Sequence, residues 1–175
     1  KISNDMIKMI DKRAFDLAAT VGSNQKIYLN DKRVPINNFK KYVEMFMDNE
    51  SKLVFDNFGS DWSVGVSYKP DQGFQQVSYV NGIATFKGGN HVKHVEDAII
   101  KKLVAIMKKK SKDVKIKASH LKEHLFFFVN CMVVNPAFTS QTKEELKTLP
   151  EEFCTECNVT DAFVKRIQKT GLTDR

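Results

Sequence analysis

The segment Asn135–Lys143 (NPAFTSQTK) contains the residue types that can recognise a terminal phosphate. Its lysine, Lys143, follows Gln141 and Thr142, with a further hydroxyl at Ser140. An ammonium among hydrogen-bonding groups can neutralise charge on a γ-phosphate, and it therefore responds to the difference between ATP and ADP. The tripeptide Gln-Thr-Lys alone favours a solvated loop lysine, because short motifs often mislead. The whole string, taken together with a second unusual string upstream, Ser78–His91, favours a phosphate contact.

A second candidate site is the lysine run Lys108, Lys109, Lys110 and Lys112. Residues 101–122 contain nine lysines and one acid, a local charge of +8, so the rest of the chain sums to −1 within a total of +7. Such a run without interleaved aromatic residues favours contact with a nucleic-acid backbone and no reading of bases. The alternative is a solvated helix end, where cations also complement the helix dipole.

Histidines and cysteines give weak evidence for a metal site. Three pairs have ligand-like spacing: His91 with His94, His120 with His124, and Cys154 with Cys157. A structural zinc site usually needs four ligands in two matched pairs, and the single Cys-x-x-Cys has no second pair nearby. We therefore expect no metal, and we find no Ser/His/Asp or Cys/His set for nucleophilic catalysis.

Other polar motifs receive structural interpretations. Gly88-Gly89 lacks the following lysine of a P-loop, so we interpret it as a break before a helix. Glu96 and Asp97 lie at helical spacing from lysines, which predicts surface ion pairs. An odd number of cysteines argues against a secreted disulfide scaffold and favours an intracellular protein, with Cys131 buried in an apolar run.

Helical and strand periodicities alternate along the chain and must position these residues. Helices are expected at residues 3–21, 37–48, 91–110 and 160–170, strands at 53–55, 62–68, 74–80 and 125–134, and a hairpin turn at Asn30-Asp31. The stripe of the first helix is Ile7, Ile10, Ala14, Leu17 and Val21, and that of the long helix is Val92, Val95, Ile99, Leu103 and Ile106. This order indicates an α+β (α/β-like) fold with one main sheet backed by helices. No apolar run is long enough to span a membrane.

The string Asn135–Lys143 and the upstream string Ser78–His91 (SYVNGIATFKGGNH) together resemble the transducer region of type II DNA topoisomerases of the eukaryotic and large-DNA-virus kind. The resemblance extends through Tyr28–Asn30, Phe74–Gln76 and Lys108–Lys112. It implies that residues 1–40 are the C-terminal edge of a gyrase-type ATPase domain and that residues 41–175 are the transducer domain. It also implies a left-handed βαβ crossover, whereas the general rule favours the right-handed form.

The same resemblance implies a function in a parent enzyme that passes one DNA duplex through another at the expense of ATP. It makes Lys143 the switch lysine and the catalytic residue of this region, and it assigns Gln141, Thr142 and Lys143 to the nucleotide phosphates. It assigns Lys108, Lys109, Lys110 and Lys112 to double-stranded DNA held inside the ATP gate.

Further partners and the location also follow from the resemblance. ATP and Mg²⁺ would act in the full-length enzyme and are not expected on this chain alone, which we expect to be inactive. The partners would be DNA, the remaining ATPase domain and cleavage core, and a second copy in a homodimer, with no membrane. The location would be the nucleus, or the cytoplasm for a viral protein.

Two alternatives belong to other functional classes. One is the transducer of a mismatch-repair or chaperone ATPase, which the complete Gln-Thr-Lys string disfavours. The other is a stand-alone, non-specific DNA-binding module, which leaves that string without a role. The chain begins inside a helical pattern without an initiator methionine, and we therefore expect it to be a fragment.

Overall fold

A computed structural model describes residues 2–49, 51–110 and 117–172, with the side chain of Lys110 outside the description. The chain divides into two compact units, Lys1–Phe46 and Met47–Arg175. The division falls somewhat after residue 40, because the second helix packs with the first. Among the described helices, none is both long and apolar enough to cross a membrane.

The first unit contains two helices and a short hairpin. Its elements are α1 (Asn4–Thr20), β1 (Tyr28–Leu29), β2 (Lys32–Arg33) and α2 (Phe39–Glu44). Ser3 caps α1 by accepting a hydrogen bond from the Met6 amide. Asn30 and Asp31 have φ values of 49° and 61°, the left-handed backbone that a two-residue hairpin turn requires. The predicted hairpin is confirmed.

A buried carboxylate joins the two helices of this unit. Asp16 is 3% exposed, accepts a 2.8 Å hydrogen bond from the Tyr42 hydroxyl, and is paired with the Lys12 ammonium. The apolar stripe predicted for α1 is not its buried face. Ile7, Ile10 and Val21 are 46%, 56% and 41% exposed, whereas the buried residues of the helix are Asp16, Ala18 and Ala19. The predicted stripe was therefore wrong, because helical spacing does not reveal which face a neighbouring element will cover.

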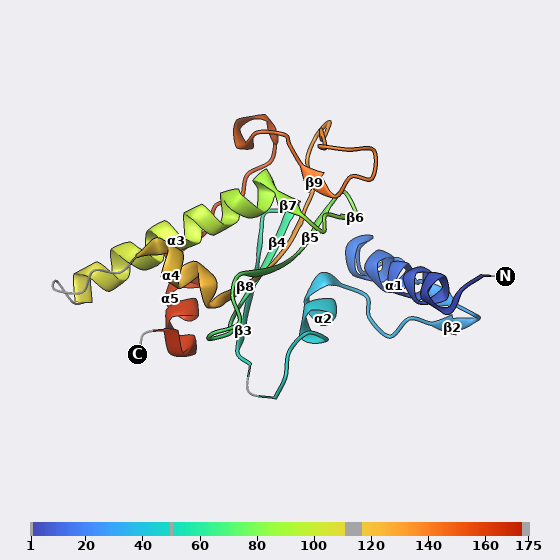
Figure 1. Ribbon diagram of the computed structural model, residues 1–175, viewed down its shortest axis with the longest axis horizontal. Coiled ribbons are helices and arrows are strands. Elements are labelled where there is room, and N and C mark those ends of the chain that lie inside the picture. Colours follow the sequence, from blue (N-terminus) through green and yellow to red (C-terminus); the bar gives the residue numbers. More distant parts are fainter. Residues whose placement is uncertain (1, 50, 111–116, 173–175) are drawn as a thin grey trace. The chain divides into compact units, whose positions relative to one another are not determined.

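The second unit contains a five-stranded mixed sheet with helices on one side (Figure 1). Its elements are β3 (Leu53–Phe58), β4 (Trp62–Tyr68), β5 (Gln75–Val80), β6 (Ile83–Ala84), β7 (Gly88–Gly89), α3 (Asn90–Lys110), α4 (Ala118–Glu123), β8 (Leu125–Cys131), β9 (Glu145–Leu146), η1 (Pro150–Glu152), α5 (Asp161–Ile167) and η2 (Gln168–Leu172). The strand order is β3-β4-β8-β5-β6. β5 and β8 are parallel, and the other neighbours are antiparallel. This confirms the predicted fold class, while the hand of the crossover from β5 to β8 stays a prediction.

Helix α3 supplies one layer of the core. Val95, Ile99 and Leu103 are fully buried in the same cluster as Phe127 and Val129 of β8. Their spacing of four residues is the cause, because it places them on one helical face. Cys131 ends β8 and is also buried, as expected. Burial raises the pKa of its thiol well above the ordinary range, which keeps the sulfur protonated.

The ion pairs of α3 differ from those expected. Glu96 is 7% exposed and pairs with Lys122 of α4 at 2.9 Å. Lys102 pairs with Asp161 of α5 at 2.7 Å. The prediction of surface pairs within the helix was therefore wrong for Glu96, because helical spacing does not reveal which side chains a neighbouring element will bring closer. These pairs instead tie α3 to α4 and α5.

Candidate functional site

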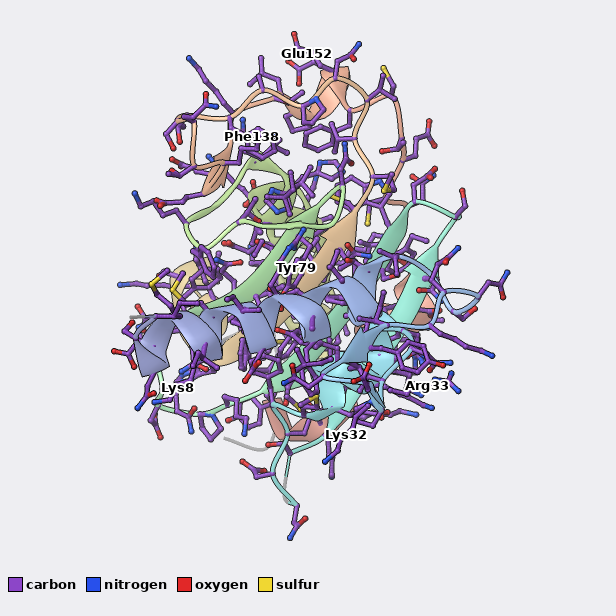
Figure 2. All side chains as sticks on the ribbon, turned by 90° about the vertical axis from the view of Figure 1, so that its right-hand side faces the viewer. Lys8, Lys32, Arg33, Tyr79, Phe138 and Glu152 are labelled. Atoms are coloured by element: carbon purple, nitrogen blue, oxygen red, sulfur yellow. The ribbon has the colours of Figure 1, made fainter. Side chains whose placement is uncertain are left out.

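The loop between β8 and β9 carries the predicted phosphate-contacting residues on a fixed base. Ala137 is held by two short bonds: its amide donates to the Thr148 hydroxyl at 2.7 Å, and its carbonyl accepts from the Lys147 amide at 2.8 Å. Further along, the Thr139 amide donates to the Glu145 carbonyl at 3.1 Å. In Figure 2, the labelled loop residue Phe138 lies above Tyr79 of the sheet. These hydrogen bonds therefore fix the base of the loop.

The tip of the loop presents its polar groups to solvent. Gln141, Thr142 and Lys143 are all exposed. The Thr142 and Ser140 hydroxyls share a 2.8 Å hydrogen bond, and the Lys143 amide donates to the Ser140 carbonyl at 3.1 Å. Lys143 has a φ of 58°, a left-handed backbone that is uncommon for a residue with a side chain and that tends to occur at functional sites. Its ammonium lies 5.9 Å from the Phe138 ring centre, where an anion could still reach it.

A charged neighbour that we did not predict from the sequence lies next to this tip. The Lys87 ammonium contacts the Glu144 carboxylate at 2.7 Å, and the Lys87 amide donates to the Glu144 carbonyl at 2.9 Å. The hydrogen bond between the two side chains is the largest cause of a lowered pKa at Glu144 and of a raised pKa at Lys87. Far apart in the sequence, the two residues gave no spacing signal that could have predicted the pair.

Two glycines connect the loop to the start of α3. Gly88 and Gly89 form β7, which pairs in parallel with Glu145 and Leu146 of β9. A Cβ at Gly89 would lie 2.5 Å from the Leu146 nitrogen, so only glycine permits this approach. The Asn90 side chain adds hydrogen bonds to the carbonyls of Lys147 and Thr148, at 2.8 and 3.1 Å. The glycine pair is thus a packing site as well as a break before the helix.

A buried polar chain lies behind these glycines. The Thr85 hydroxyl contacts the Ser78 hydroxyl at 2.6 Å and the His91 Nε2 atom at 3.1 Å. His91 is fully buried, and burial lowers its pKa to about 3, so the ring is neutral near pH 7. Sequence spacing alone suggested a possible metal ligand at His91. In the structure, its ring instead takes part in a hydrogen bond with Thr85 inside the core.

The other candidate metal ligands are also separate from one another. His94 packs between Trp62 and Phe153, and the His124 Nδ1 atom accepts a hydrogen bond from the Asp71 amide at 3.2 Å. Cys154 is exposed whereas Cys157 is buried. Within the described ranges, no three His, Cys, Asp or Glu side chains gather as a metal-binding group.

The lysine run lies at the opposite end of α3 from the loop (Figure 1). Lys108 and Lys109 are exposed in the last turn of the helix, and Lys110 ends it. Lys112 falls outside the described residues. A helix of 21 residues is about 30 Å long. The two candidate sites are therefore distinct, and α3 is the element that joins them.

Comparisons with known proteins place this geometry in a family. Residues 17–173 match the family model described as DNA gyrase B. The chain is 40% identical over 182 residues to DNA topoisomerase 2 of Bombyx mori and 41% identical over 179 residues to that of Acanthamoeba polyphaga mimivirus. Each alignment covers 99% of this chain but only 12% and 14% of the relative.

A solved structure shares the fold. The ATPase region of Saccharomyces cerevisiae topoisomerase II superposes with a TM-score of 0.90 at 36% identity, over 99% of this chain and 44% of that one. The matches cover both compact units, including the loop and the glycine pair. The chain belongs to the DNA gyrase B family and is homologous to part of the ATPase region of eukaryotic and viral type II DNA topoisomerases.

Proposed function

We propose that this chain is the transducer part of an ATP-dependent type II DNA topoisomerase and that Lys143 is its switch lysine. The observation that carries the proposal is an exposed lysine with left-handed backbone on a loop whose base is fixed by main-chain bonds. Family membership supports the nucleotide, since the related yeast region is described as an ATPase. A preorganised cation needs no reorganisation when charge develops on a phosphate.

Lys143 would contact the γ-phosphate, while Gln141 and Thr142 would hydrogen-bond the neighbouring phosphate oxygens. The exposed loop tip fits this role, because its amide, hydroxyl and ammonium groups face solvent. When ATP is bound, it supplies the γ-phosphate that is transferred to water. The accompanying Mg²⁺ would be held by the phosphates and by other parts of the enzyme, since the described residues offer no group of three metal-binding side chains. Loss of the γ-phosphate would remove the partner of Lys143 and change the position of its loop.

The remaining parts of the chain also fit a topoisomerase. The lysine run would contact the backbone of duplex DNA, and a second copy would complete a dimeric gate. Residues 1–40 would be the C-terminal edge of the ATPase domain, whose remainder would cover the exposed Ile7 and Ile10 of α1. Residues 41–175 would be the transducer. The parent enzyme would act in the nucleus, or in the cytoplasm if it is viral.

Substitution of Lys143 tests the proposal in the parent protein with its complete ATPase domain. Lys143→Ala should lower the turnover number for ATP hydrolysis about a hundredfold and change nucleotide binding little, as expected for a charge used mainly in the transition state. Lys147→Ala removes an exposed lysine from the same segment and should leave turnover unchanged. Near-normal hydrolysis by the Lys143 variant would contradict the assignment.

The coding sequence upstream distinguishes this proposal from the stand-alone DNA-binding module. A gyrase-type nucleotide-binding domain should precede residue 1 in the parent gene. Its absence would leave Lys143 without a nucleotide and would favour the module. Homology to proteins named DNA topoisomerase 2 already favours a topoisomerase over a mismatch-repair or chaperone ATPase.

A further inference from the structure

We propose that Lys87 is a positioning residue that holds the Lys143 loop in the geometry needed to meet a phosphate. Lys87 does not contact the nucleotide in this proposal; it acts through Glu144, the residue that follows Lys143. The inference rests on the proposed function of Lys143 and names a part of the site that the Gln-Thr-Lys string does not contain.

The chain around Lys87 is held on the sheet by several bonds. The Thr85 amide donates to the Ser78 carbonyl at 2.8 Å, and the Gln76 side chain donates to the Phe86 carbonyl at 3.0 Å. The Thr85 hydroxyl also contacts the Nε2 atom of the buried His91, near the start of α3. Because these partners belong to β5 and the start of α3, the backbone of Lys87 has a fixed position relative to the core.

On the loop side, the half-buried Glu144 takes both contacts from Lys87. Its carboxylate lies 2.7 Å from the Lys87 ammonium, and its carbonyl accepts from the Lys87 amide at 2.9 Å. The preceding residue, Lys143, donates its amide to the Ser140 carbonyl at 3.1 Å, and the Ser140 hydroxyl contacts that of Thr142. The backbone of Lys143 is therefore held on one side by the turn to Ser140 and on the other by the residue that Lys87 contacts.

The exposure of the pair determines what it can do. The Lys87 and Glu144 side chains are 69% and 32% exposed, and an ion pair in such surroundings is screened by water and salt. It therefore contributes little to global stability. The pair instead acts on the loop tip, which is otherwise held mainly by main-chain bonds at the base of the loop. At the tip, a weak restraint is enough to select one geometry.

Amide hydrogen exchange in this chain tests the positioning without nucleotide. Lys87→Gln should speed exchange of the Lys143 and Thr139 amides about threefold to fivefold, the range expected for loss of an exposed ion pair. Lys87→Arg keeps the cation and should restore the slow exchange. Lys147→Gln makes the same charge change on the neighbouring segment and should leave exchange as in the wild type. The melting temperature of Lys87→Gln should fall by no more than about 2 °C, because surface changes of this kind cost little.

Turnover in the parent protein completes the test. Lys87→Gln should lower the turnover number by a similar factor of about three to five with KM for ATP unchanged, and Lys87→Arg should recover it. Unchanged exchange in Lys87→Gln overturns the inference whatever the turnover. Normal turnover of Lys87→Gln beside a defective Lys143→Ala also overturns it and leaves the proposed function intact. Normal turnover of Lys143→Ala overturns both.

Discussion

Among single residues, the buried imidazole of His91 links the core to solution pH. Its Nε2 atom contacts Thr85, and its Nδ1 atom has no hydrogen-bond partner within the described part of the chain. Protonation would place a charge at this site, and burial lowers the pKa to about 3 from 6.5. Between these two values the unfolded chain binds a proton that the folded chain does not.

The free energy of unfolding should therefore fall as pH decreases from 6.5 toward 3, and His91 should contribute nothing to its pH dependence above 6.5. The expected slope from this group is about 1.4 kcal/mol per pH unit. Urea titrations at pH 7, 6 and 5 measure it. His91→Gln should reduce the slope of the unfolding free energy against pH by the contribution of about one proton. His120→Gln, at an exposed position, should leave the slope unchanged. Equal slopes in the wild type and the His91 variant would show that the ring is charged in the folded state.

At the scale of elements, the contact between β7 and β9 connects the candidate loop to α3. It depends on the absence of a side chain at Gly89, which has a φ of 127° and lies against the Leu146 backbone. The backbone of one strand cannot shift without moving the hydrogen bonds of the other. The two short strands thus form a rigid joint between the loop and the helix.

Gly89→Ala should open this joint, because both the left-handed backbone and the steric clash oppose a methyl group. We expect a loss of about 3 kcal/mol in the free energy of unfolding, measured by urea denaturation. Gly73→Ala is the matched control, since Gly73 also has positive φ but open space around it. The control should lose about 1 kcal/mol. Equal losses of unfolding free energy in the two variants would mean that the close contact of Gly89 with β9 adds nothing to the cost of the strained backbone.

At the scale of the whole molecule, positive charge is concentrated in one stretch. Residues 101–122 carry a charge of +8, more than the net +7 of the whole chain, and the exposed Lys108 and Lys109 stand at the end of α3. Lysine ammoniums bind phosphates as point charges and cannot read bases by paired hydrogen bonds. Binding through this stretch should therefore depend strongly on salt and barely on DNA sequence.

Four phosphate contacts, from Lys108, Lys109, Lys110 and Lys112, predict a slope of about −3.6 for the logarithm of duplex affinity against the logarithm of salt concentration. Changing Lys108–Lys110 to Glu should flatten that slope by about 2.7 and preserve the fold, because Lys108 and Lys109 are exposed. Fluorescence anisotropy with a labelled duplex measures both values. The control changes Lys26, Lys32 and Lys40, exposed lysines of the first unit, to Glu. If both triple variants keep the wild-type slope, the lysine run does not contact DNA and is a solvated helix end.

Elements with a local sequence pattern could be predicted from the amino-acid sequence. The stripe from Val92 to Ile106 repeats over several turns, with Ile106 partly buried at its end, and Asn30-Asp31 is a turn signal within two residues. Both predictions are confirmed, because helical periodicity and turn chemistry depend on near neighbours along the chain. The loop residues Gln141 to Lys143 likewise belong to one local string, and their roles stay predictions.

The contacts that surround those residues could not be predicted from the sequence and depend on how the chain folds. β7 and β9 have two residues each, too few to show any period, so only their pairing reveals them. Lys87 is one exposed lysine among many in the sequence, and folding sets it beside Glu144. The same holds for Glu96, whose partner comes from α4. The physical reason is that such contacts require two distant segments to be packed on one core, and a single segment carries no information about which neighbour it will meet.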